Sequence, residues 1–386
     1  MANLFFIFCL YSIISVLFYV CLMFYFRIGL NQLHFNLDLK KKPNTFITVV
    51  VCFRNEEQYL TKLLNSLTTQ NYPQHFYEIV LYNDASSDNS VDIINKFISN
   101  CKSQNIILRE LPVLPNSNAA KKIALNDAAK ISKAELIVVT DADCTMDENW
   151  LTIIEHCYQT NNSQMISGPV SLQHENSWIN ALQKLELHGL AAASAGAFGK
   201  NNPIMCNGAN MAFNRITFLS IDPFKNNLHI NSGDDMFLMM AMHKENAMSM
   251  HFLAHPNAMV STVGKNNLSD YINQRVRWAS KSKSYTNNLI KVVALVVLNL
   301  NLLIVLSIIL CFIFSIKFGL IITIGLIILK QLSEMYLLQK FTKLFNVNIN
   351  YFQLFLFQYI EAVFTVLVAI KSIKGSYIWK GRRLQV

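Results

Sequence analysis

Two carboxylates one position apart, Asp141 and Asp143, are the residues of this chain best placed to do chemistry. They follow residues 136–140, a continuous apolar run that predicts a buried strand. A strand that ends in two carboxylates delivers both to the carboxyl edge of a sheet, where open α/β folds bind ligands. Paired carboxylates suit a divalent cation that bridges a diphosphate, so this edge is the first candidate site.

Polar side chains follow two further apolar runs in the same way. Phe53, Arg54 and Glu57 end the first run, and Asp84 ends the second. Because parallel strands end at one edge of a sheet, we expect these residues to lie beside the carboxylate pair. Taken alone, Asp84 fits an Asx turn or a helix cap equally well, so only its position favours a role in binding.

Two lysines open the helix that is predicted for residues 119–131. The helix macrodipole disfavours cations such as Lys121 and Lys122 at a helix N-terminus unless an anion is bound nearby. The pair therefore indicates an anion site, and the alternative is two solvated lysines.

An acid pair, Asp234 and Asp235, follows Gly233 and directly precedes the helix predicted for residues 236–242. A carboxylate beside a second acid in a pocket has a raised pKa and can act as a general base. The alternative is that both acids only complement the positive end of the helix dipole.

Two further stretches carry polar side chains in a pattern that suits a site. Residues 206–208 read Cys-Asn-Gly, and Gln274, Arg277 and Trp278 fall on one side of a helix turn. The alternative for the second stretch is a snorkelling arginine with an interfacial tryptophan ahead of a membrane span.

The elements that must position these residues lie between residues 44 and 285. Strand-like runs alternate there with amphipathic helical patterns, which predicts an α/β fold with a mostly parallel sheet and helices on both faces. Asn55 is expected to cap the helix whose apolar positions begin at Leu60. No internal repeat or low-complexity segment interrupts this region.

The chain is too apolar for an ordinary soluble protein, with 52% hydrophobic residues and a mean hydropathy of +0.29. Residues 4–26 form an uncharged apolar run of spanning length, so residues 1–30 are predicted to be an N-terminal transmembrane anchor. Basic residues follow this run, which places the region after it in the cytoplasm. A cleaved signal peptide is the alternative, but the basic start, shorter core and cleavage site are missing.

A second apolar block, residues 289–372, contains three runs at 292–316, 318–338 and 351–370. The basic tail 373–386 is expected in the cytoplasm, which requires an even number of spans in this block. Two or three membrane segments are therefore predicted. Residues 318–338 contain charges, so this run spans, re-enters the membrane, or lies at the interface with its polar side outward.

The net charge of +9 lies near the membrane borders, which favours anionic lipid headgroups over nucleic acid as its partner. The eight cysteines show no metal-binding spacing, and they predict neither a zinc site nor a disulfide framework.

In their order along the chain, six stretches resemble the family 2 glycosyltransferases, in particular their membrane-bound, processive-type branch. They are Phe53-Arg54-Asn55-Glu56-Glu57, Asn83-Asp84-Ala85-Ser86, Ala120-Lys121-Lys122, Asp141-Ala142-Asp143, Gly233-Asp234-Asp235 and Gln274-Arg275-Val276-Arg277-Trp278. The resemblance covers residues 44–285 and implies a GT-A nucleotide-diphospho-sugar transferase fold. Asn83, Ala85 and Ala120 depart from the residues that the family usually has there, without removing a reactive group.

The resemblance also implies how the donor is bound. Asp84 would hydrogen-bond the nucleotide base, usually uracil. The backbone around Phe53 and Arg54 would support the nucleoside, Lys121 would face the diphosphate, and Glu57 belongs to the same donor-binding motif.

The metal and the acceptor side follow from the same resemblance. Asp143 would bind Mg²⁺ or Mn²⁺, Asp141 would lie nearer the ribose or donor sugar, and Asp235 would be the catalytic base. The residues implied on the acceptor and diphosphate side are Asn207, Gly208, Asp234, Gln274, Arg277 and Trp278.

The implied activity is that of an inverting hexosyltransferase in the inner membrane, with a cytoplasmic catalytic domain. It would move a sugar from a nucleotide sugar, usually a UDP-sugar, to a saccharide or lipid-linked acceptor in envelope or polysaccharide biosynthesis. Single transfer to a lipid carrier or glycolipid and a silent sugar-nucleotide-binding assembly partner are the alternatives. A transporter is disfavoured because about 240 residues are of soluble type, and participation of other envelope-biosynthesis subunits stays open.

Overall fold

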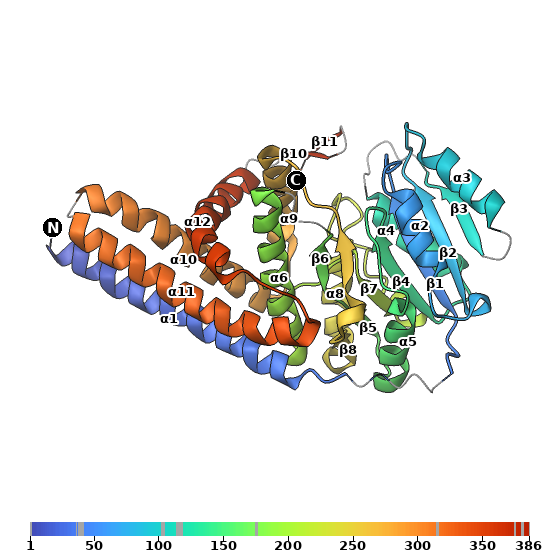
Figure 1. Ribbon diagram of the computed structural model, residues 1–386, viewed down its shortest axis with the longest axis horizontal. Coiled ribbons are helices and arrows are strands. Elements are labelled where there is room, and N and C mark those ends of the chain that lie inside the picture. Colours follow the sequence, from blue (N-terminus) through green and yellow to red (C-terminus); the bar gives the residue numbers. More distant parts are fainter. Residues whose placement is uncertain are drawn as a thin grey trace.

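The computed structural model describes residues 2–35, 37, 42–101, 105–112, 119–173, 177–313, 316–373, 376–379 and 382–385. A bundle of long helices occupies one end of the molecule and an α/β region the other, with helix α6 (Trp178–Gly199) between them (Figure 1). The predicted boundaries of the anchor, catalytic region and C-terminal block remain predictions. Lys374, in the predicted basic tail, lies outside the described residues.

A mixed sheet of seven strands forms the centre of the α/β region, in the order β3-β2-β1-β4-β7-β5-β8. The strands are β1 (Ile47–Phe53), β2 (Tyr77–Asn83), β3 (Ile106–Glu110), β4 (Leu136–Asp141), β5 (Met165–Ser167), β7 (Met211–Asn214) and β8 (Met250–Phe252). Strands β1 to β4 are parallel, whereas β7 runs antiparallel to both of its neighbours. The predicted mostly parallel α/β sheet is confirmed.

Helices cover both faces of this sheet. Alternate residues of β1 enter different cores: Val50 packs in the core that contains residues of α4 (Ala120–Ile131), and Val49 in the core that contains residues of α2 (Leu60–Thr68). Burial on both faces explains why the central strands read as continuous apolar runs.

The remaining elements of this region are short or lie at its borders. They are α3 (Ser90–Asn100), α5 (Trp150–Asn161), α7 (Arg215–Ile221), α8 (Asp234–Glu245), α9 (Leu268–Ser280), β6 (Val170–Leu172), β9 (Val260–Thr262), β10 (Ser376–Trp379), β11 (Arg382–Gln385), and the 3-10 turns η1 (Gln74–Phe76), η2 (Ala247–Ser249), η3 (Pro256–Ala258) and η4 (Lys281–Ser284). Strand β6 pairs with β9, and β10 with β11.

The prediction that Asn55 caps α2 is wrong. The helix begins at Leu60, and Asn55 has a positive φ of 50° in the loop before it. Its side-chain oxygen accepts the N–H of Ser87 at 2.8 Å, so Asn55 ties this loop to the loop after β2. Asparagine tolerates the left-handed region, and here its side chain bonds to another loop instead of to the helix that follows.

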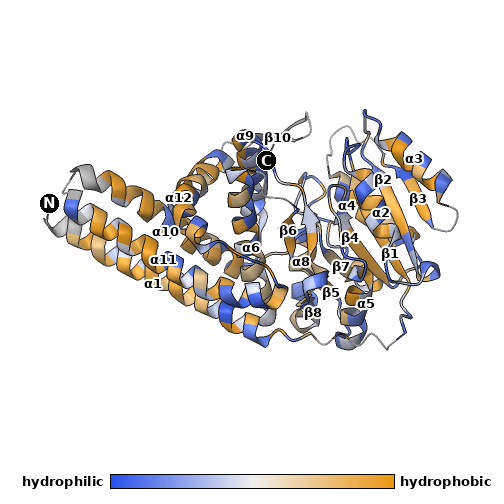
Figure 2. Cartoon of the chain, in the orientation of Figure 1, coloured by the Kyte–Doolittle hydropathy of each residue, from blue (hydrophilic) through white to orange (hydrophobic). Residues whose placement is uncertain are grey.

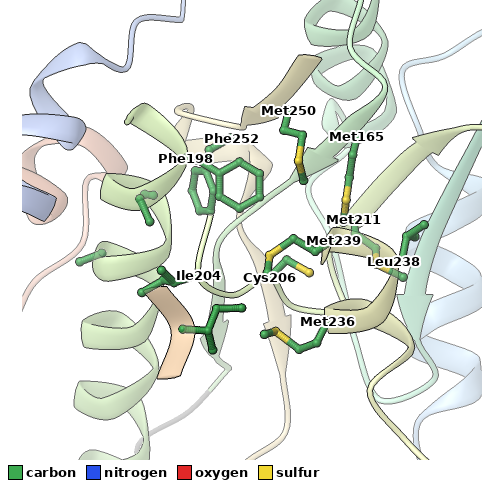
Figure 3. Close-up of a cluster of buried hydrophobic side chains, with 14 of the residues drawn as sticks. Met165, Phe198, Ile204, Cys206, Met211, Met236, Leu238, Met239, Met250 and Phe252 are labelled. Carbon is green, nitrogen blue, oxygen red and sulfur yellow. The ribbon is translucent and has the colours of Figure 1, made fainter. Parts of the chain in front are cut away.

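A methionine-rich core lies between α6, α8 and the sheet. Figure 3 shows Met239 and Met250 with Phe198 and Phe252, whose ring centroids are 5.7 Å apart. Methionine is flexible and fills irregular spaces. This core joins the α/β region to α6, which packs against the long helices.

Four helices of the described part are long and apolar enough to span a membrane. They are α1 (Ala2–Gln32), α10 (Asn288–Ile313), α11 (Ile316–Phe345) and α12 (Tyr351–Ile373). Figure 2 shows apolar residues over most of their length. Helix α1 approaches α6 at Gly29 and Gly196, where a Cβ on Gly29 would lie 1.8 Å from the Gly196 carbonyl oxygen, so only glycine fits.

The polar side of residues 318–338 does not face outward, so the interfacial placement that was one of the alternatives for this run is wrong. Lys330 of α11 is fully buried, and its ammonium lies 2.8 Å from Glu334 and 3.2 Å from Glu361 of α12. It also donates to Gln358 at 2.6 Å. Pairing across two helices explains how charged residues enter an apolar bundle.

Candidate active site

A cavity of about 720 Å³ lies at the carboxyl edge of the sheet. It contains the ends of β1, β2 and β4, and it continues to α6, α9 and the start of α10. Of the residues to which the family resemblance gives a role in the site, all but one line it: Phe53, Arg54, Asp84, Lys121, Asp141, Asp143, Asn207, Gly208, Asp234, Asp235, Gln274, Arg277 and Trp278.

Glu57 is the exception. Its carboxylate accepts hydrogen bonds from the backbone and side chain of Asn89, at 3.0 and 2.9 Å, in the loop before α3. Glu57 therefore fixes two loops to each other outside the cavity. Its neighbour Glu56 lines the cavity instead.

The strand ends meet because of the sheet register, in which Phe53 pairs with Asn83 and Cys52 with Asp141. Arg54 then fixes the turn after β2 by donating to the carbonyl oxygens of Asp84 and Ala85. The Asp84 carboxylate is thereby held at the cavity, while the Arg54 side chain is engaged in positioning the turn.

The two departures in this turn have a structural consequence. Asn83 donates to the Glu110 carboxylate at 2.8 Å, and its side-chain oxygen accepts the N–H of Ser86 at 2.9 Å. Ala85 has a φ of 49°, a region that favours glycine. The turn therefore keeps a left-handed residue, and Asn83 stabilises it from both sides.

The two lysines of α4 have different surroundings. Lys121 donates to Asp141 at 2.6 Å and to the Gly208 carbonyl at 2.8 Å, and it lies 3.6 Å from Asp234. Burial lowers the pKa of Lys121, but the charges of Asp141 and Asp234 outweigh it and hold the pKa above its usual value. Lys121 therefore carries a positive charge inside the cavity.

Lys122 points elsewhere and is 1% exposed. It donates to the carbonyl oxygens of Asn227 and Ile230 at 2.7 and 2.9 Å, and its ammonium lies 4.5 Å from the ring centroid of Phe237. Burial lowers its pKa to about 8. Lys122 thus fastens the loop before α8.

The acid pair occupies the first turn of α8, after Gly233 with a φ of 84°. Burial raises the pKa of Asp234, whose Oδ2 is buried without a hydrogen-bond partner. The carboxylate of Asp235 accepts the N–H of Met236 at 2.7 Å and that of Gly208 at 3.4 Å. Two acids thus share one helix terminus but have different hydrogen bonding.

Gly208 brings these groups together. A Cβ at this position would lie 2.9 Å from the Lys121 ammonium and 3.2 Å from Asp234. The backbone can approach the lysine and the acid pair only because residue 208 has no side chain.

The surroundings of Asp143 suit a divalent cation that is bound partly by this carboxylate and partly by the substrate. Its carboxylate lines the cavity and accepts from the Thr262 hydroxyl at 3.2 Å, while Asp141 pairs with Lys121. Among the described residues, no three His, Cys, Asp or Glu side chains are grouped to hold a metal alone. Mg²⁺ commonly takes one or two carboxylates together with substrate phosphates, which agrees with this geometry.

Helix α9 presents Gln274, Arg277 and Trp278 to the cavity, as its spacing predicted. Arg275 points to α6, where its guanidinium forms an ion pair with Glu186 and packs 4.2 Å from the ring centroid of Trp278. It also donates to Gln274 at 2.7 Å. Arg275 therefore positions two of the cavity-lining side chains.

Lys281 and Tyr285 also line the cavity but carried no signal in the sequence. Lys281 is 8% exposed, and burial lowers its pKa although the charge of Asp235 opposes this. Both residues follow the predicted helix, in a stretch without a recognisable pattern. Only their distance of three and seven residues beyond Trp278 could have suggested them.

Comparison of the sequence with known families decides the family. The sequence model of glycosyl transferase family 2 matches residues 48–219, and that of glycosyl transferase family group 2 matches residues 136–366, more than half of the chain. The chain belongs to glycosyl transferase family group 2. It is therefore a glycosyltransferase, and the two models together cover the cavity and most of the C-terminal helices.

Two curated relatives match parts of the chain. One is the poly(ribitol-phosphate) beta-glucosyltransferase of Bacillus spizizenii, 35% identical over 97 residues, which are 25% of this chain and 14% of that protein. The other is the beta-monoglucosyldiacylglycerol synthase of Trichormus variabilis, 24% identical over 135 residues, which are 34% of this chain and 28% of that protein. In both cases the match spans less than a third of the relative.

A solved structure matches nearly the whole chain. The mannosyltransferase PcManGT from Pyrobaculum calidifontis, in complex with GDP-Man and Mn²⁺, has a TM-score of 0.57 and 14% sequence identity. The match covers 95% of this chain and 99% of that one. This likeness shows that the two chains share a GT-A-like fold.

Proposed function

We propose that this glycosyltransferase moves a sugar from a nucleotide sugar, usually a UDP-sugar, to a saccharide or lipid-linked acceptor with inversion at the anomeric carbon. The observation that carries this proposal is the convergence of Asp84, Lys121, Asp143 and Asp235 on one cavity. These residues supply a group for the base, a cation for the diphosphate, a metal ligand and a proton acceptor.

Donor binding follows from the strand ends. Asp84 would receive a hydrogen bond from the base, with its turn held by Arg54. Lys121 would meet the diphosphate, and Asp143 would hold Mg²⁺ or Mn²⁺ on it. The cation would neutralise charge on the leaving diphosphate. The GDP-Man and Mn²⁺ of the PcManGT structure support a donor of this class.

Transfer requires one displacement. The acceptor hydroxyl oxygen bonds to the anomeric carbon, the bond from that carbon to the diphosphate oxygen breaks, and the electron pair leaves with the diphosphate. Asp235 takes the hydroxyl proton. A single attack from the opposite face inverts the configuration, and no second nucleophile in a matching motif suggests retention.

The long apolar helices support a place at the membrane. Four helices of the described part have spanning length and composition, and α12 packs on the cavity-lining helix α9. Basic residues after the first apolar run put the catalytic region in the cytoplasm by the positive-inside rule. We propose an integral protein of the inner membrane with that orientation.

A donor panel tests the function. Full-length protein in nanodiscs made with bacterial lipid extract, given UDP-glucose, UDP-N-acetylglucosamine or GDP-mannose with Mn²⁺, should release the nucleoside diphosphate from one donor and label a product. Excess EDTA should stop both. Failure of every nucleotide sugar in this panel to bind or to be consumed by folded protein would contradict the proposal.

A further inference from the structure

The cavity does not end at the catalytic carboxylates. It continues between α6 and α10, where its lining includes Leu187, Leu190, Ala191, Ile290, Val293 and Ala294. All six side chains are aliphatic. The cavity therefore joins a charged end at the sheet to an apolar end beside the long helices.

The apolar end borders one of the candidate membrane spans. Helix α10 begins at Asn288, so Ile290, Val293 and Ala294 belong to its first two turns. Ala294 is exposed, and the next residue, Leu295, is 66% exposed on the outer side of the same helix. An apolar chain at this end of the cavity would thus be adjacent to the bilayer.

The polar residues of α6 that line the cavity already have partners. Ser194 donates to the carbonyl of Met205 at 2.7 Å. Gln183 donates to the carbonyl of Lys265 at 2.8 Å and accepts its N–H at 2.9 Å. Sugar hydroxyls buried here would lose water without gaining hydrogen bonds, whereas methylene groups would gain from leaving water.

We propose that the acceptor is a membrane lipid whose headgroup presents a hydroxyl, an inference that rests on the proposed function and extends it. The lipid chain occupies the apolar end between α6 and α10, and the headgroup extends to Asp235. The headgroup oxygen forms the new bond to the anomeric carbon, its proton passes to Asp235, and the nucleoside diphosphate leaves with the electron pair.

A matched pair of substitutions tests the apolar end. Ala294→Trp places an indole at a cavity-lining position, and Leu295→Trp places one on the next residue, which does not line the cavity. Nanodiscs made with bacterial lipid extract receive the labelled donor that the wild-type protein consumes. The label is then partitioned between chloroform–methanol and water, and donor binding is measured separately.

The wild-type protein should place the label in the organic phase. Ala294→Trp should lower this transfer roughly tenfold or more while donor affinity stays unchanged, as expected for steric mismatch in an apolar pocket. Leu295→Trp should transfer normally. Anion-exchange separation of the organic product shows whether the lipid that carries the sugar is neutral or contains a phosphodiester, and either product supports the proposal when the sugar is bound to a headgroup hydroxyl.

Label that appears only in a water-soluble saccharide would overturn the lipid acceptor but leave the nucleotide-sugar transferase intact. Equal transfer by Ala294→Trp and the wild-type protein would overturn the assignment of the lipid chain to the space between α6 and α10, and it would leave the nucleotide-sugar transferase intact. If Ala294→Trp does not fold, Val293→Phe replaces it as the obstructing variant, with the same expected loss. Absence of donor binding in the wild-type protein would instead count against the proposed function itself.

Discussion

Two clusters of charged side chains, one at the cavity and one between the long helices, are built from similar residues but differ in what they leave unpaired. In the cavity cluster, Lys121 stands among Asp141, Asp234 and Asp235, and one oxygen of Asp234 is buried without a hydrogen bond. Lys281 adds a second cation beside Asp234 and Asp235, and all five residues line the cavity.

The bundle cluster is closed. Lys330 contacts Glu334, Gln358 and Glu361, while Tyr19 and Gln358 donate to the two oxygens of Glu334 at 2.5 and 2.6 Å. None of these five residues lines the cavity. A satisfied network holds helices together, whereas an incompletely satisfied one beside a cavity is prepared for a ligand.

The largest expected effect separates the acids of the cavity cluster. Asp235→Asn keeps the shape of the side chain but removes the proton acceptor, so kcat should fall by roughly 10² to 10⁴ with donor affinity nearly unchanged. Asp234→Asn should cost less, because Asp234 is expected only to influence its neighbour. Steady-state kinetics with the consumed donor measures both.

Asparagine is also a good helix cap. If both acids only cap α8, the two variants should turn over at nearly the wild-type rate, and the assignment of Asp235 would fail. Unaltered thermal unfolding of each variant is the required control.

Substitution of the lysine in the bundle cluster should lower the stability of the fold. Lys330→Met leaves two partly buried carboxylates without their cation, and it should cost less than the about 3–5 kcal/mol of breaking a fully buried pair because Glu361 is 37% exposed. Thermal unfolding in detergent measures the loss, with Lys343→Met, at an exposed position of the same helix, as the control. Activity per folded molecule should remain near wild type. If Lys330→Met has normal stability but has lost transfer activity, the bundle cluster has a functional role and the contrast with the cavity cluster is wrong.

The smallest effect concerns the border of the cavity. Glu57→Gln keeps an acceptor for Asn89 outside the cavity, so donor affinity should change by less than about twofold, within the scatter of surface substitutions. Glu56→Gln, which alters a cavity-lining residue, should change it more. A larger loss from Glu57→Gln in a donor titration would restore the sequence-based assignment of Glu57.

The site could be predicted to the extent that it depends on strand ends. Apolar runs located β1 and β4, and their register then brought Phe53 and Asp141 to one edge. Glu57 was assigned to the site although Glu56 is the residue that lines the cavity. The two acids are neighbours in a loop, where no periodicity predicts which side chain faces the cavity. Lys281 was missed because its position follows from the 3-10 turn after α9 and not from a motif.

Prediction from the sequence was also limited by pairing between residues that lie far apart along the chain. The antiparallel β7 is only four residues long, and its place between β4 and β5 depends on pairing with residues far along the chain. Likewise, one of the three placements predicted for residues 318–338 turned their polar side outward, whereas Lys330 pairs with Glu361, which lies 31 residues away on another helix. Periodicity within one segment carries no information about such partners.

The central claim is that the cavity binds a nucleotide sugar through a metal held by Asp143. Calorimetric titration of the full-length protein with UDP, and with GDP for the second donor class, in Mn²⁺ and in EDTA, tests it most directly. We expect binding in Mn²⁺ that disappears in EDTA and in Asp143→Ala, because Asp141 is paired with Lys121 and cannot hold the cation alone. Equal binding by wild type and Asp143→Ala, with and without metal, would contradict the account.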